Sequence, residues 1–188
     1  MKRTALALAA VMFAAAFPAL AGDGSWSVLP IQSRSYQADP TVALKLGAVD
    51  PAHLPGGFAG GIEVAVDDPL LSPPVGRIRD QFSYTVADHG GVMLQMLEVN
   101  PHYLYPLGSN WWVGGGPGVG YVIASPDRGS SADLWAVQAG GQIQYWSGGL
   151  MVGLESRYQW TEDATIGTGT ASGGADNWLT TLKLGVRF

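Results

Sequence analysis

Apolar and polar residues alternate along most of this chain, and the alternation is clearest over its last eleven residues, 178–188. Because the side chains of a β-strand point alternately to its two faces, Lys183 and Arg187 fall on one face and an almost wholly apolar set falls on the other. An apolar face suits lipid, and a polar face suits the interior of a barrel. The pattern therefore predicts a membrane β-strand whose outward residues include Trp178, Leu182, Leu184, Val186 and Phe188.

Eight runs of this kind follow one another from residue 41 to residue 188. Most have the length of a tilted membrane strand, about 9–11 residues, and single-chain bacterial barrels use even strand numbers from eight upward. The predicted fold class is all-β, an eight-stranded antiparallel transmembrane β-barrel occupying residues 41–188 as one domain. The predicted strands span 41–49, 58–67, 76–87, 92–105, 111–124, 133–146, 149–160 and 177–188.

Charged and polar side chains fall on the predicted interior face of most strands. An eight-stranded barrel is only wide enough for side chains to fill, so we expect opposite charges to pair and close the lumen. A conductive path lined by the same residues is the alternative. One strand is irregular, because Leu94 and Met96 share the face of Glu98, and a β-bulge near Gln95 would reconcile them. The interior set is Lys45, Glu63, Arg77, Arg79, Glu98, His102, Glu155, Arg157, Lys183 and Arg187.

A glycine-rich stretch lies in the predicted strand 111–124. Neither nucleotide-binding spacing, G-x-G-x-x-G or G-x-x-x-x-G-K-[ST], can be placed on it, so a phosphate loop is excluded. Instead Gly114, Gly116, Gly118 and Gly120 share the interior face and leave a bare strip for side chains of other strands. Pro117 removes one backbone donor and predicts a second bulge.

The connections between strands predict an orientation with the C-terminal strand ending in the periplasm. The connections 106–110 and 147–149 are then short periplasmic turns, and 50–57, 124–132 and 161–176 are external loops. Two connections do not fit, because 68–75 is long for a periplasmic turn and 88–91 is short for an external loop.

Aromatic residues gather at the ends of the predicted strands, where Trp and Tyr would lie at the level of lipid headgroups. They predict two girdles. One holds Tyr103, Tyr105, Trp111, Trp112, Tyr145, Trp146 and Phe188, and the other holds Tyr121, Trp135, Tyr158, Trp160 and Trp178.

The N-terminal 21 residues have the features of a secretory signal peptide: Lys2 and Arg3, an apolar run, and Ala19-Leu20-Ala21 as a small-residue cleavage pattern. We expect cleavage near Ala21. Residues 22–40 then form an N-terminal extension, whose prolines and serines argue against an amphipathic helix. We expect a loosely ordered periplasmic extension, with a partial plug or an extra edge-lying strand as the alternatives.

Charge and composition exclude several kinds of function. Without Lys2 and Arg3 the chain carries eight Lys and Arg against fifteen Asp and Glu, a formal charge of −7, so nucleic acid is not an expected partner. The chain has no cysteine, and the spacing of His53, His89 and His102 does not match a metal site, so we predict no metal and no cofactor.

These patterns resemble the small outer-membrane barrels of the OmpA transmembrane domain, OmpX and OmpW type. The resemblance rests on 42–50, 112–121, 153–158 and the terminal Leu184-Gly-Val-Arg-Phe188. It implies the bacterial outer membrane as the location, and recognition of the terminal strand by the barrel-insertion machinery, with Trp178, Leu182, Leu184, Val186 and Phe188 as the assembly signal.

The resulting prediction is a structural or surface-interaction protein with a largely occluded polar lumen, a monomer that contacts outer-membrane lipids and lipopolysaccharide. The alternatives are a narrow porin-like passage for small or apolar solutes and a lipid A-modifying enzyme. We predict no enzyme and no catalytic residues, because no histidine has a serine within three residues and Ser156 is expected to face lipid. Carboxylates in the external loops, such as Glu162, Asp163 and Asp176, are expected to be solvated.

Overall fold

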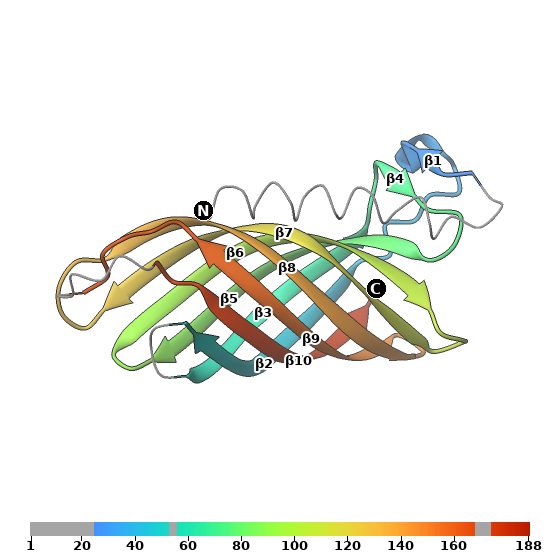
Figure 1. Ribbon diagram of the computed structural model, residues 1–188. Helices are drawn as coiled ribbons and strands as arrows, with labels where there is room; N and C mark the ends of the chain where they lie inside the picture. Colours follow the sequence, from blue (N-terminus) through green and yellow to red (C-terminus); the bar gives the residue numbers. More distant parts are fainter. Residues whose placement is uncertain (1–24, 53–55, 168–173) are drawn as a thin grey trace.

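The computed structural model describes residues 25–52, 56–167 and 174–188, whose main body is a closed antiparallel β-barrel (Figure 1). The ring order is β10-β2-β3-β5-β6-β7-β8-β9, so the last strand pairs with the first long strand. The predicted all-β, eight-stranded antiparallel barrel is confirmed, while the predicted signal peptide lies outside the described residues. The strands are β2(Thr41–Pro51), β3(Gly57–Asp67), β5(Arg77–His89), β6(Val92–Pro106), β7(Trp111–Pro126), β8(Ala132–Ser147), β9(Leu150–Thr161) and β10(Asn177–Arg187).

Strands β2 and β10 define the two ends of the barrel. Thr41 pairs with Arg187 at one end, and Pro51 pairs with Asn177 at the other. We call these the Thr41 end and the Pro51 end. Among the described residues, no helix is long and apolar enough to span a membrane.

Alternation of side chains sorts each strand into two faces, as predicted. In β9, for example, Leu150, Val152 and Leu154 are exposed on the outer wall, whereas Glu155 and Arg157 are buried inside. The outer wall is therefore apolar along its middle, and the polar side chains lie in the interior, which is the reverse of a water-soluble barrel.

The two predicted bulges are wrong. Strand β6 pairs with β5 and β7 without a shift on both sides of Gln95. The pairing of β6 with β7 stops at Val99↔Val119 and resumes in the same register at Tyr103↔Gly115. In that register Pro101 stands opposite Pro117, and neither residue has a backbone N–H to donate. The prolines therefore interrupt the hydrogen bonds without inserting a residue.

Glycines let neighbouring strands approach closely at defined points. A Cβ added to Gly47 in β2 would overlap the backbone carbonyl of Thr180 in β10, whereas a Cβ at Gly60 in β3 would meet its nearest atom, Leu46 Cδ2, at 3.7 Å. We expect Gly47→Ala to lower the free energy of unfolding by about 1–3 kcal/mol, since a clash with backbone cannot be relieved by a side-chain rotation. Urea unfolding of the refolded variants tests this, with Gly60→Ala as the control because its added Cβ has room. Equal urea midpoints for Gly47→Ala and Gly60→Ala would contradict the expectation.

Both connections that did not fit the predicted loop pattern have a structural reason. Strands β5 and β6 meet in a two-residue hairpin, in which Gly90 and Gly91 both have positive φ, 56° and 81°. The long connection between β3 and β5 contains a short strand, β4(Leu71–Ser72), which pairs with β1(Ser27–Val28) from the N-terminal segment.

The N-terminal segment is therefore not loosely ordered over its described part, residues 25–40. A short 3-10 helix, η2(Pro30–Gln32), follows β1, and Leu29 N–H donates to the carbonyl of Leu70 at 2.7 Å. The Tyr36 hydroxyl donates to the carbonyl of Asp67 at 2.6 Å, and burial raises the pKa of this phenol. We call residues 25–36 and 68–75 the side lobe.

Candidate functional site: the filled interior of the barrel

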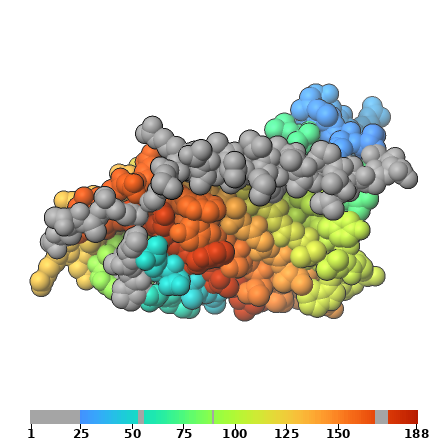
Figure 2. All heavy atoms as spheres, viewed as in Figure 1, coloured from blue at the N-terminus to red at the C-terminus, as the bar shows by residue number. Residues whose placement is uncertain are grey.

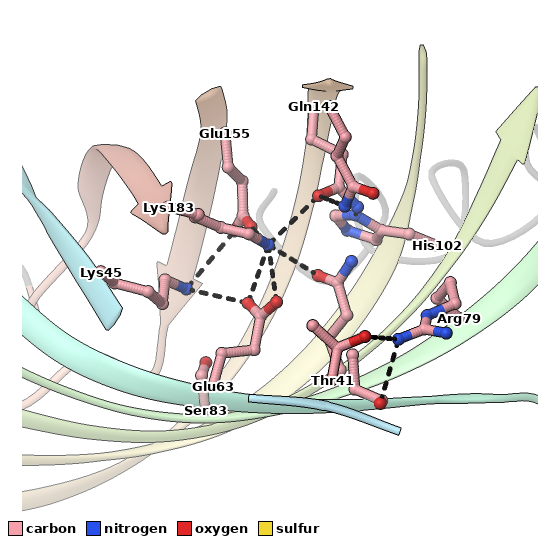
Figure 3. A network of polar contacts seen from close by, with 12 residues as sticks. Thr41, Lys45, Glu63, Arg79, Ser83, His102, Gln142, Glu155 and Lys183 are labelled. Carbon is pink, nitrogen blue, oxygen red and sulfur yellow. Dashed lines mark hydrogen bonds and ion pairs between the residues drawn. The ribbon is translucent and has the colours of Figure 1, made fainter. Parts of the chain in front are cut away.

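The centre of the interior holds a charge-balanced cluster, which we call the central network. Its three cations are Lys45, Arg157 and Lys183, and its three carboxylates are Glu63, Glu98 and Glu155. Each of the six residues is at most 4% exposed. They come from β2, β3, β6, β9 and β10, so the network joins strands on several sides of the ring. Figure 3 shows four of the six, Lys45, Glu63, Glu155 and Lys183.

Lys183 and Glu155 make the short contacts of this network. The Lys183 ammonium donates to Glu155 at 2.6 Å and to Glu63 at 2.8 Å. Glu155 also accepts from Arg157 Nη1 at 2.9 Å, and Arg157 Nη2 donates to Glu98. Lys45 Nζ lies 3.6 Å from both Glu63 and Glu155 and makes no hydrogen bond to any residue that the structure describes. Buried ion pairs hold only when their remaining groups are also satisfied, so Lys45 is the least supported cation.

A chain of side-chain hydrogen bonds leads from the central network toward the Thr41 end. Gln142 Oε1 accepts from Lys183 at 3.1 Å and from Gln144 at 2.8 Å. Its amide nitrogen therefore donates to His102 Nδ1, 2.7 Å away. Gln144 in turn accepts from the indole N–H of Trp146 at 3.1 Å. His102 is thus a hydrogen-bonded interior residue.

A second charged cluster lies at the Thr41 end, and it includes three of the predicted interior residues, Arg77, Arg79 and Arg187. Arg77 and Arg79 are largely buried, whereas Arg187, the last residue of β10, is 42% exposed and lies at the rim rather than in the interior. All three approach Asp39, which the N-terminal segment supplies: Arg77 Nη1 lies 2.8 Å and Arg187 Nε 3.5 Å from its carboxylate, and Arg79 donates to its carbonyl at 2.7 Å. Asp67 adds a carboxylate oxygen 3.0 Å from Arg79. Sequence reasoning placed the arginines inside but missed Asp39, because it lies outside the strand pattern.

Two tryptophans belong to this closure rather than to the aromatic girdle. Trp146 is buried, and the guanidinium of Arg77 lies 4.5 Å from the ring centre of Trp112 and 5.4 Å from that of Trp146. Their even positions in β7 and β8 place them on the interior face, so strand parity would have separated them from Trp111 and Tyr145. Those two neighbours remain on the outer wall as a tilted ring pair, with centroids 4.9 Å apart.

Toward the Pro51 end the interior holds an apolar cluster, which sequence reasoning also missed, beside buried polar residues such as Gln159, Thr161 and Asn177. Leu94 and Met96, whose position had suggested a bulge, point inward and are fully buried with Val122, Leu134 and Leu179. Ala164 and Ile166, from the connection after β9, pack against this cluster. The alternation already placed Leu94 and Met96 on the interior face with Glu98, but the expectation of a polar lumen led to the prediction of a bulge instead.

The predicted glycine strip is confirmed on the interior face of β7. A Cβ on Gly118 would overlap the Asn100 amide, and one on Gly120 would lie 3.2 Å from the carbonyl of Leu97 and 3.3 Å from Gln159 Nε2. A Cβ on Gly116 would first overlap the backbone carbonyl of Pro101. The strip therefore makes room for the Asn100 side chain and also lets β6 approach β7 closely.

Two hollows of about 380 Å³ lie on the outside of the barrel. One is an apolar groove on the outer wall, lined by residues such as Phe82, Leu97 and Trp135. The other lies between the side lobe and the wall, and Tyr36, Asp68 and Ile78 are among its lining residues.

Ser156 lies on the outer wall, 3.0 Å from the hydroxyl of Thr180. Asp176, expected to be a solvated loop residue, is instead buried and accepts from the backbone N–H of Thr161 at 2.7 Å. Within residues 25–52, 56–167 and 174–188, no group of three or more His, Asp or Glu is arranged to hold a metal ion.

The chain shares its fold with two solved bacterial proteins. It matches Neisserial surface protein A with a TM-score of 0.56 and 13% sequence identity, over 79% of this chain and 96% of that chain. It matches Ail, the attachment invasion locus protein of Yersinia pestis, with a TM-score of 0.54 and 11% identity, over 81% of this chain and 100% of that chain. No family model and no curated protein matches the sequence. At these identities the likeness concerns the fold.

Proposed function

We propose that this protein is an integral β-barrel of the bacterial outer membrane with a non-conducting interior, and that it has a structural or surface-interaction role. The observation that carries the proposal is the filling of the interior at three levels. An apolar cluster and the buried polar residues beside it fill the Pro51 end, the central network fills the middle, and arginines with two tryptophans fill the Thr41 end. A solute would have to displace all three.

The outer wall supports the membrane location. Exposed Leu, Ile, Val and Phe residues occupy its middle, and Tyr145, Trp111, Trp135 and Trp178 lie toward the strand ends. Such a wall has a favourable environment only in lipid, since the apolar belt would otherwise face water. The two solved proteins that share the fold are named for the cell surface and for attachment, which favours a surface role over transport.

The proposed partners follow from this location. Outer-membrane lipids and lipopolysaccharide would surround the wall. During assembly the insertion machinery would recognise β10, whose outward residues Trp178, Leu182, Leu184, Val186 and Phe188 are exposed. The Pro51 end would face outward from the cell, and the Thr41 end the periplasm.

Single-channel recording in planar bilayers tests the closed interior. Protein refolded in detergent is first checked by the shift of its unboiled band on a gel, so that only closed barrels are added. We expect no discrete current steps, because charges and apolar side chains occlude the lumen at every level. Reproducible current steps from folded protein would overturn the proposal and favour the narrow passage. A separate measurement addresses the enzyme alternative: release of acyl chains from lipid A when the protein is overexpressed would favour it.

A further inference from the structure

The side lobe leaves an apolar surface uncovered at the Thr41 end. Val28 is 71% exposed, Ile31 is 56% exposed and Leu70 is 57% exposed. Leu29, Leu71 and Val75 are also exposed. A contiguous exposed apolar set of this kind usually marks an interaction surface.

The pairing of β1 with β4 gives the side lobe an amphipathic two-stranded sheet. Val28 pairs with Leu71 and Ser27 pairs with Ser72, so the two-stranded sheet has an apolar side and a polar side. Ser27, Ser72 and part of Leu71 line the hollow between the lobe and the wall. Val28, Ile31 and Leu70 do not line it and are more than half exposed, so their apolar surface is free to meet something other than the barrel.

The lobe lies beside the barrel wall rather than across its mouth. Ile78 points outward from β5 but is only 7% exposed, and it lines the hollow beneath the lobe. The hydroxyl of Tyr103, on β6, donates to the carbonyl of Val75 at 3.0 Å. Figures 1 and 2 show the lobe, in blue and green, projecting sideways from one end of the barrel. It is therefore level with the aromatic residues of the Thr41 end, where the apolar wall stops.

We propose that the side lobe rests on the membrane surface at the Thr41 end, with Val28, Leu29, Ile31, Leu70 and Leu71 inserted among the lipids. This inference rests on the proposed membrane location of the barrel. A lipid surface is the occupant because the apolar side of the lobe continues the apolar outer wall at the level where headgroups meet acyl chains. The hollow beneath is a poor site for a headgroup phosphate, since it presents Asp67 and Asp68, and its Arg77 is already paired with Asp39.

Site-directed spin labelling tests this directly, because the chain has no cysteine and each introduced one is unique. Labels are placed at Val28→Cys and Ile31→Cys in the lobe, at Leu154→Cys on the apolar wall and at Arg128→Cys in the exposed connection after β7. Each variant is refolded into vesicles of phosphatidylcholine and phosphatidylglycerol and checked by the gel shift. Collision with oxygen reports lipid, and collision with a water-soluble nickel chelate reports water.

We expect labels 28 and 31 to collide several-fold more with oxygen than with nickel, as label 154 does, and label 128 to show the reverse. Lobe labels that behave like label 128, while label 154 reports lipid, would overturn the lobe proposal and leave the proposed function intact. A water-like label 154 would instead overturn the membrane location itself.

Discussion

Glu155→Gln is expected to lower the free energy of unfolding by about 3–5 kcal/mol, the range for removing one partner of a buried ion pair. Glu155 is the carboxylate shared by all three cations of the central network, at 2.6 Å from Lys183, 2.9 Å from Arg157 and 3.6 Å from Lys45. Without it, three buried positive charges face only Glu63 and Glu98. The cost is measured by urea unfolding of the refolded protein in vesicles, followed by tryptophan fluorescence.

Asp50→Asn is the matched control, because it also removes one carboxylate but from an exposed position in β2. Its midpoint should stay close to that of the unchanged protein. If Glu155→Gln and Asp50→Asn shifted the midpoint equally, the loss would reflect overall charge and not the central network.

A second variant separates charge balance from the loss of particular hydrogen bonds. Within the described part of the chain, Lys45 has carboxylates at 3.6 Å and no hydrogen bond, so it is the cation whose removal disturbs the fewest contacts. Lys45→Met combined with Glu155→Gln restores neutrality and should recover part of the stability lost in Glu155→Gln alone. A double variant less stable than either single one would contradict a network governed by its charge balance.

Much of this fold could be predicted from the sequence because a β-strand has a side-chain period of two. That period places Lys45, Glu63, Glu98, Arg157 and Lys183 inside without knowledge of which strands are neighbours. The strand number and the ring order then follow, since adjacent antiparallel strands joined by short turns pair with one another. Strand ends were less certain, because polar residues of the turns continue the alternation.

The grouping of the interior residues could not be predicted in the same way. The distance between Lys183 and Glu63 depends on strand register and on the tilt that closes the ring, which the period of one strand does not fix. The separate cluster at the Thr41 end also needs Asp39, which precedes β2 and so lies outside its alternating pattern. The side lobe depends on a two-residue strand pair, β1 with β4, which is too short to leave a periodic signal.

The second large expected loss of stability concerns the apolar cluster toward the Pro51 end, which contains Met96. Met93 lies in the same strand, β6, on the opposite face, and serves as its comparison. Met96 is fully buried in the interior, and Met93 is 44% exposed on the outer wall. Met96→Ala should lower the free energy of unfolding by about 2–5 kcal/mol, since it leaves a cavity among Leu94, Val122 and Leu134 that the rigid ring cannot collapse to fill. Met93→Ala should have a much smaller effect, since lipid chains fill the space that it opens.

Urea unfolding of both variants in vesicles measures the difference, and Met96→Leu, which keeps nearly the same volume, should cost less than about 1.5 kcal/mol. The same Met96→Ala protein should remain silent in planar bilayers despite its cavity, because the central network and the cluster at the Thr41 end close the interior independently. Equal losses in Met93→Ala and Met96→Ala would contradict the inward placement of Met96. Current steps from folded Met96→Ala would mean that the apolar cluster around Met96, and not the central network or the cluster at the Thr41 end, blocks conduction through the interior.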